Sequence, residues 1–346
     1  MSFQRTNQDD QRKLTPTLQR VVCWSVCIVA ASSGCARLCP LRPKSIDCQT
    51  VYHSERLIDD QPQIQRGKRR PVIDTVGWVI GIPSKILLWN HRVDNHNISE
   101  TTEHAVTEYL DQNGLSTVRV RLNQYHPMDD WRRLVRNDSV GAGWRYTFGA
   151  VSVLGETLIP GRIFGGDHFN PYTNTVHIYS DVPAIAIHEG GHAKDFSRRK
   201  WKGTYAAAYL LPIVPLYHES LATNDALAYL ETNGTPSEQA DARKILYPAY
   251  GTYIGGAAGS VFPTVSAPLY YGSVIAGHAV GRYEAYETLN RPGTNPIPTP
   301  YSAENTVAPY ASGNSTTQLP QPANGVGNQS LVSDGVNTPA SLSTRP

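Results

Sequence analysis

The most constraining feature of the chain is the pentad His188–His192, which reads His-Glu-Gly-Gly-His. It follows the apolar run Ala184–Ile187, which predicts the start of a buried helix. Residues four apart lie on one face of a helix, so both imidazoles can bind one Zn²⁺ with bonds of about 2.0–2.1 Å. Glu189 stands beside the first ligand, where it can take a proton from water on the metal. The pentad therefore predicts a catalytic zinc site.

A strand and a tight turn are expected before this helix. Residues 174–180 alternate and are rich in β-branched and aromatic side chains, which indicates a strand. Ser180 or Asp181 is the expected N-cap, and Pro183 suits the first turn. Residues 198–200 are basic and fall near the helix end, where cations complement the helix dipole.

The third ligand is expected from the next predicted helix, residues 217–230. Glu219 shares one face of that helix with two alanines, which permit a close approach. Gly190 and Gly191 each cost about 1 kcal/mol relative to alanine in a helix interior. We therefore expect the two glycines to make room for the Glu219 helix or for substrate.

Other residues compete with Glu219 for this role. Asp195, His218 and Asp225 are the alternative third ligands. Asp195 follows His192 by three residues, near the same helix face, but a solvated or supporting carboxylate is the more ordinary interpretation. His168 lies in a loop before the predicted strand, where it could reach the site or serve a structural role.

His188, Glu189, His192 and Glu219 match the gluzincin pattern in type and order. This region resembles zinc peptidases of the zincin type. In the gluzincin branch of these peptidases, a glutamate on a second helix completes the zinc site. The resemblance implies Zn²⁺ on His188, His192 and Glu219 with water at the fourth position, and a peptide or protein substrate. It also implies that Glu189 accepts the proton of the water. By analogy, strand 175–179 would lie along the cleft and pair with an extended substrate.

The resemblance covers residues 175–231 and departs from the gluzincin pattern in two places. Thr223 stands where gluzincins often carry an aspartate bonded to a zinc histidine, and the nearest acid is Asp225. The interval from His192 to Glu219 is also longer than in the thermolysin-like branch. The residues considered as donors to the oxyanion are His278, Tyr271, Arg282 and Tyr283.

The N-terminus predicts export. Lys13 and Arg20 precede an apolar run at 21–31, too short for a comfortable membrane span, and small residues lead to Cys35. This segment resembles a bacterial lipoprotein signal, which implies cleavage after residue 34 and lipid on Cys35. An ordinary cleaved signal and an uncleaved anchor are the alternatives. All three place the catalytic part in the cell envelope, on the periplasmic or extracellular side.

Composition divides the remaining chain into three parts. Residues 35–70 are polar and partly basic, which indicates a tether. Residues 71–290 are the expected metallopeptidase-like domain, and residues 291–346 are rich in Pro, Ser, Thr, Asn and Gly, which predicts a disordered tail. All five cysteines precede Thr50, so the domain contains no disulfide; Cys39 and Cys48 are left either as a pair or as free thiols. A net charge of +2 gives no sign of nucleic-acid binding.

Within the domain, the pattern predicts an α+β fold. We expect a helix at Glu100–Asn113 capped by Ser99, a half-buried strand at 116–122, a short helix at Met128–Arg136 and strands within Trp144–Leu158. The zincin resemblance implies a small mixed sheet with the metal-binding helix, followed by a helical lobe.

Residues 245–281 contain no charged side chain, and glycines repeat every four residues along them. Small residues at this spacing let helices pack closely, and Pro263 and Pro268 divide the segment into a helical hairpin. A tightly packed core pair is favoured over a hairpin that enters the bilayer, because Tyr, Ser and Thr are frequent. Residues 205–217 are similarly a pocket wall or a membrane-facing loop. The rival to a peptidase is a non-catalytic envelope protein with a structural zinc site and a hairpin used for membrane association or assembly.

Overall fold

The central sheet is small, and its strands come from distant parts of the chain. The computed structural model describes residues 41–47 and 50–291. In these residues the sheet has the order β1 (Ile64–Arg66), β2 (Arg119–Leu122), β4 (Thr175–Ile178), β3 (His168–Asn170). β1, β2 and β4 run parallel, and β3 is antiparallel to β4. The chain is therefore an α+β protein with a mixed sheet, as the sequence predicted.

One face of the sheet is apolar. Val120 and Leu122 of β2 lie in register with Val176 and Ile178 of β4. These side chains join the main hydrophobic core with residues of α4 (Glu100–Gln112) and α9 (Pro183–Ser197). Burial of this face holds α9, the helix that carries the pentad, against the sheet.

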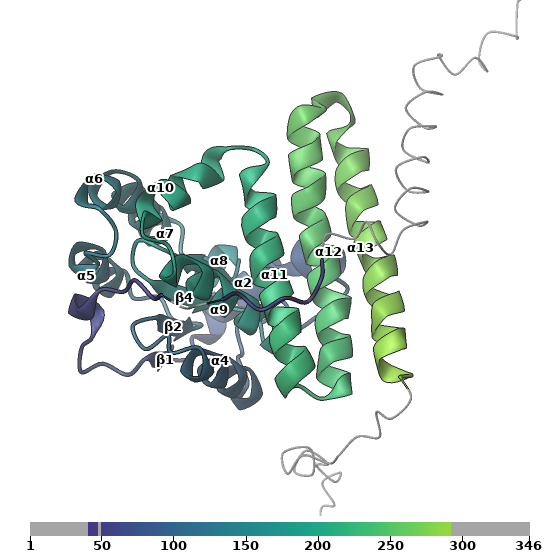
Figure 1. The fold of residues 1–346 in the computed structure, drawn as a ribbon, viewed down its shortest axis with the longest axis horizontal. Helices are drawn as coiled ribbons and strands as arrows, with labels where there is room; N and C mark the ends of the chain where they lie inside the picture. The colour runs from purple at the N-terminus through teal and green to yellow at the C-terminus, as the bar shows by residue number, and fades with distance from the viewer. Residues whose placement is uncertain (1–40, 48–49, 292–346) are drawn as a thin grey trace, which may run out of the picture. The chain divides into compact units, whose positions relative to one another are not determined.

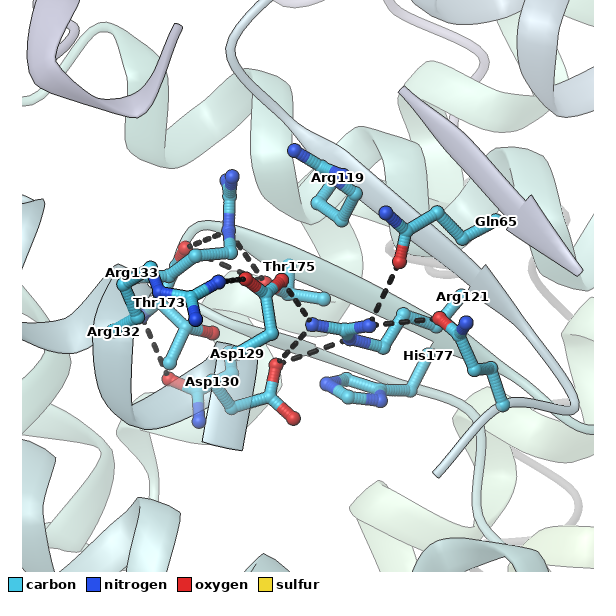
Figure 2. Close-up of polar contacts among 12 residues, drawn as sticks. Gln65, Arg119, Arg121, Asp129, Asp130, Arg132, Arg133, Thr173, Thr175 and His177 are labelled. Carbon is cyan, nitrogen blue, oxygen red and sulfur yellow. Dashed lines mark hydrogen bonds and ion pairs between the residues drawn. The ribbon is translucent and has the colours of Figure 1, made fainter. Parts of the chain in front are cut away.

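The opposite face carries polar side chains that are also buried. Arg121 of β2 bonds to Asp129 and Asp130 of α5 (Pro127–Arg136), and Arg133 of that helix reaches the backbone at Thr173. Figure 2 shows this network, with His177 beside Arg121. The expectation that residues 116–122 form a half-buried strand is therefore wrong for burial, because β2 is buried throughout and its arginines are paired with carboxylates.

The C-terminal helices form the lobe beside α9. α11 (Val214–Asn233) packs against α9 and α12 (Pro236–Val261), and α12 pairs with α13 (Ser266–Leu289) along its length (Figure 1). A Cβ added at Gly251 would lie 2.6 Å from the Ser273 carbonyl oxygen, and one at Gly277 would lie 2.6 Å from that of Tyr247. The glycine repeat thus lets α12 and α13 pack closely, as its spacing predicted, while one face of the pair stays exposed. None of the helices in the described part meets the length and apolarity needed to cross a membrane.

Several local predictions are confirmed. α4 ends at Gln112, and the Ser99 side chain caps it by accepting the Thr102 amide. α5 covers the predicted 128–136 helix. The strands expected within Trp144–Leu158 are wrong, because the segment is helical. Arg145, Gly149 and Val153 are buried at intervals of four, which is the helical period.

The ordered chain begins before the expected boundary at residue 71. β1 lies within the predicted tether and pairs with β2. Leu41 and Ile46 are buried, and the Ile46 amide donates to Asp225. Pairing and burial at these positions make part of the expected tether an integral part of the fold.

The remaining elements are helices of ten residues or fewer. They are η1 (Glu55–Leu57), α2 (Pro71–Ile80), α3 (Ile82–Leu87), α6 (Ala142–Trp144), the π-helical turn η2 (Arg145–Gly149), α7 (Ala150–Leu158), α8 (Gly161–Phe164), α10 (Lys202–Ala207), η3 (Ala208–Leu210) and η4 (Pro263–Val265). The predicted signal at 1–34, Cys35, Cys39, Cys48 and the tail from 292 lie outside the described residues.

Candidate metal centre

The pentad lies on a helix that is buried on all sides. Residues 184–197 of α9 are buried, because the helix packs against α4, α11, α12 and strands β3 and β4. Pro183 occupies the first turn, as predicted, but the N-cap is Val182, with no side-chain cap from the described residues. Asp181 instead accepts bonds from Ser99 and Thr102, at the start of α4. The prediction that Ser180 or Asp181 caps α9 is therefore wrong.

Three side chains converge between α9 and α11. The Nε2 atoms of His188 and His192 are 3.2 Å apart, and Glu219 Oε2 lies 3.2 Å from the first and 3.4 Å from the second. All three residues are buried. The structure thus brings together the two pentad histidines and the glutamate that the sequence favoured.

These distances can be compared with the geometry of a bound ion. Four donors placed tetrahedrally at about 2.0–2.1 Å from zinc are about 3.3–3.4 Å from one another. The three measured separations are close to this value. The His₂Glu donor set is also a common one for catalytic zinc, in which three protein ligands leave a fourth position open. The arrangement therefore fits a zinc-sized ion without large movement of the side chains.

Close packing between α9 and α11 sets the position of Glu219. A Cβ at Gly191 would lie 3.0 Å from the carbonyl oxygen and 3.1 Å from the Cα of Ala222, one turn beyond Glu219. Gly191 therefore makes room for α11, as predicted. Gly190 has a different neighbour, because a Cβ there would lie 2.7 Å from the Tyr109 ring of α4.

Thr223 supports one of the ligands. Its hydroxyl lies 3.3 Å from Nδ1 of His188, on the side of the ring opposite Nε2. With a metal on Nε2 the ring would carry its hydrogen on Nδ1, and the Thr223 hydroxyl is placed to accept that hydrogen and hold the ring in this tautomer. Thr223 thus occupies the supporting place that gluzincins often give to an aspartate.

Thr223→Val is therefore expected to weaken metal binding by about 10–100-fold, the usual cost of losing a group that orients a ligand. Thr223→Ser keeps the hydroxyl and is expected to bind metal much as the wild type does. Competition with a chromophoric chelator measures both affinities. Equal affinities for the valine and serine variants would contradict the role of the hydroxyl.

The three alternative ligands have other partners. Asp195 accepts bonds from Arg198, Arg199 and Tyr205. Asp225 accepts bonds from Ser45, Ile46, Tyr109 and Lys194. His218 is buried among aromatic rings that include Tyr205 and Tyr209, and burial lowers its pKa to about 4. None of these three belongs to the converging group of donors.

Glu219→Gln is expected to lower zinc affinity by about 100-fold or more, because it removes the anionic ligand. Asp195→Asn is a matched change on a carboxylate outside the triad and is expected to keep the metal. Metal content after dialysis against excess Zn²⁺ distinguishes them. If Asp195→Asn lost the ion and Glu219→Gln kept it, the third ligand would be Asp195.

The surroundings of Glu189 raise the pKa of its carboxyl group toward neutrality, which suits a general base. The residue is buried; burial raises its pKa, the nearby His188 lowers it, and the Glu219 charge raises it, to about 7. The pKa of Glu219 is shifted in the opposite direction. Burial opposes its charge, but His192 and His188 hold its pKa well below the usual value. The two glutamates are thus suited to different tasks, one as a proton acceptor and one as a permanent anion.

Two of the three donors, His192 and Glu219, line a cleft of about 770 Å³. Glu189 also lines it, together with Tyr253 and Gly256 of α12. Residues of the 205–217 segment also line it: Ala206, Tyr209, Pro212 and Pro215. That segment is thus a wall of the cleft, which was one of its two predicted roles.

The residues considered as oxyanion donors do not line this cleft. Tyr271 and Tyr283 are exposed, and His278 bonds to the Leu87 carbonyl and stacks on Trp89 beside Arg282. Tyr253 was missed. The residue as a whole is 40% exposed, but desolvation of its hydroxyl, the charges of Glu219 and Glu189 and a hydrogen bond with Glu219 raise its pKa above the usual value, so the hydroxyl stays a donor. Its position on the glycine-rich helix was the only sequence signal.

The strand predicted to lie along the cleft and pair with substrate also differs from the expectation. β4 has β2 on one side and β3 on the other, so its backbone has no free edge for a substrate. β1 and β3 are the edge strands of the described sheet, and it is β3 whose His168 and Phe169 line the cleft. The role predicted for residues 175–179 therefore does not fit β4, because hydrogen bonds within the sheet already occupy it.

Comparisons with protein-family models, with curated proteins and with solved structures gave no match to this chain.

Proposed function

We propose that the protein is a zinc-dependent metallopeptidase with a gluzincin-like site. The observation that carries the proposal is the spacing of His188, His192 and Glu219, which matches one face of a zinc tetrahedron, with a buried Glu189 in the same cleft. The zincin resemblance of the fold, export and lipid anchoring at Cys35 are part of the same proposal and rest on the sequence.

Each residue has a defined task in this proposal. Zn²⁺ held by the triad would supply a Lewis acid that lowers the pKa of water toward neutrality. Glu189, a buried carboxylate in the same cleft as the triad, accepts the proton from the attacking water and passes it to the leaving amine. In this proposal the Tyr253 hydroxyl exchanges its hydrogen bond to Glu219 for one to the negative charge that develops on the carbonyl oxygen.

The walls of the cleft favour an extended, partly apolar substrate. Phe169, Tyr209 and Tyr270 contribute aromatic surface. The free edge of β3 offers backbone donors and acceptors to a peptide that adds as a strand. A peptide or protein chain is therefore the substrate class that the cleft suits best.

The test uses the full chain, stripped of metal by a chelator and then reloaded with Zn²⁺. We expect cleavage of a mixed peptide library, read as new termini by mass spectrometry, to disappear with the metal and to return with zinc. Tyr253→Phe should lower kcat while leaving metal content unchanged. A chain that binds zinc through the triad but cleaves no peptide would contradict the proposal and favour the non-catalytic alternative.

A further inference from the structure

A second group of metal-binding side chains lies outside the triad. Glu156 of α7, His168 of β3 and His177 of β4 place their donor atoms within 4.8 Å of one another. His168 and His177 are paired directly across the two strands, and their rings stack with centroids 4.7 Å apart. Sheet register therefore brings two imidazoles to one point, and α7 adds a carboxylate.

His177 has no hydrogen-bond partner for either ring nitrogen among the described residues. Its side chain is only 5% exposed. Figure 2 shows the ring beside Arg121 and Asp130, and none of the marked bonds reaches it. An unpaired buried polar side chain destabilises the fold, and a bound ligand would explain why a histidine is kept here.

Glu156 is oriented toward both histidines. Its Oε1 accepts the Asn170 amide and lies 3.2 Å from His168 Nε2. Its Oε2 is buried without a partner in the described structure and lies 3.9 Å from His177 Nε2. That separation is too long for a hydrogen bond, but two ligands of one ion at about 2.0–2.1 Å can be up to about 4.2 Å apart.

His168 already has the support that metal-binding histidines commonly have. Its Nδ1 lies 2.9 Å from the Gly166 carbonyl, so Nδ1 carries the hydrogen and Nε2 faces Glu156. An ion pair between a protonated His168 and Glu156 would explain this one contact. It would leave both nitrogens of His177 and Oε2 of Glu156 unexplained.

The surroundings favour a small cation. The three residues line a cavity of about 10 Å³ that Asp130 also borders, which is the space of about one water molecule. The nearby Arg121 charge is paired with Asp129 and Asp130. Two imidazoles and one carboxylate form a donor set that prefers zinc and its first-row neighbours to Mg²⁺ or Ca²⁺.

We propose that Glu156, His168 and His177 form a second site for a divalent transition-metal ion, separate from the triad on α9 and α11. The ion would join α7 to β3 and β4. Because β3 borders the cleft and β4 leads into α9, its role would be to hold this edge of the cleft in place.

The two sites can be counted separately in the full chain. After dialysis against excess Zn²⁺, we expect about two ions in the wild type and about one in either His177→Gln or Glu219→Gln. The double variant should bind essentially none. His168→Gln removes another proposed ligand of the second ion at a partly exposed position, and it replaces His177→Gln if that variant fails to fold. His278→Gln, a buried histidine in neither group, should keep both ions.

Thermal unfolding gives an independent readout. Added Zn²⁺ should raise the Tm of Glu219→Gln through the second site, and this rise should vanish when His177→Gln is added to it. Mg²⁺ at the same concentration should not raise it. Wild-type chain that binds a single ion lost in Glu219→Gln, or a His177→Gln chain that binds as many ions as the wild type, would overturn the proposal.

Discussion

Replacing Glu189 by glutamine is expected to abolish peptide hydrolysis while the metal stays bound. The carboxamide has nearly the same shape but cannot accept a proton, and a positioned general base contributes about 10²–10⁴-fold in rate. Zinc is held by His188, His192 and Glu219, so its affinity should change little. Initial rates on a cleaved peptide, compared at equal zinc content, measure the effect.

Glu287→Gln, on the exposed surface of α13, is the matched control and should retain wild-type activity. Hydrolysis at the wild-type rate by zinc-loaded Glu189→Gln would show that another group accepts the proton. Loss of the metal in this variant would instead mean that Glu189 shapes the site rather than acting as its base.

Gly191→Leu is expected to destroy metal binding without altering a ligand. The Cβ alone would meet the Ala222 backbone at 3.0–3.1 Å, so the larger side chain must push α11 away from α9. Glu219 lies on α11, and a metal site tolerates displacements of only about 0.2 Å. We expect zinc affinity to fall by about 100-fold or more, measured by chelator competition.

Gly272→Leu is the control, because a Cβ at that helical position meets nothing within 4 Å. It should keep both folding and metal content. Gly190→Leu tests the other neighbour of α9, because its side chain would contact Tyr109 of α4 rather than α11. Normal zinc affinity in Gly191→Leu would contradict the view that α11 is positioned by this contact.

Features of short range were predictable from the sequence. The pentad, the Ser99 cap of α4 and the glycine spacing of α12 and α13 each depend on residues within a few positions of one another, and the structure contains all three. The wrong prediction of strands at 144–158 has a physical reason. A short apolar stretch is compatible with both the strand and the helix period, and its packing partners decide which one forms.

Longer-range features were decided by the tertiary structure. Glu219 stood among several candidates until the packing of α11 on α9 brought its carboxylate to the histidines. The roles of Thr223 and Tyr253 could not be assigned along the chain, because their partners, His188 and Glu219, belong to other helices.

The sequence by itself determined which chemistry is available, since metal-binding and acid–base side chains at helical spacing identify themselves locally. Only the tertiary structure decided how these side chains combine. The pairing of His168 with His177 depends on strand register, and the edge position of β3 depends on β2 and β4 being neighbours. Register and neighbour choice result from burial of the central strands β2 and β4 between helices, a property that no local stretch of sequence contains.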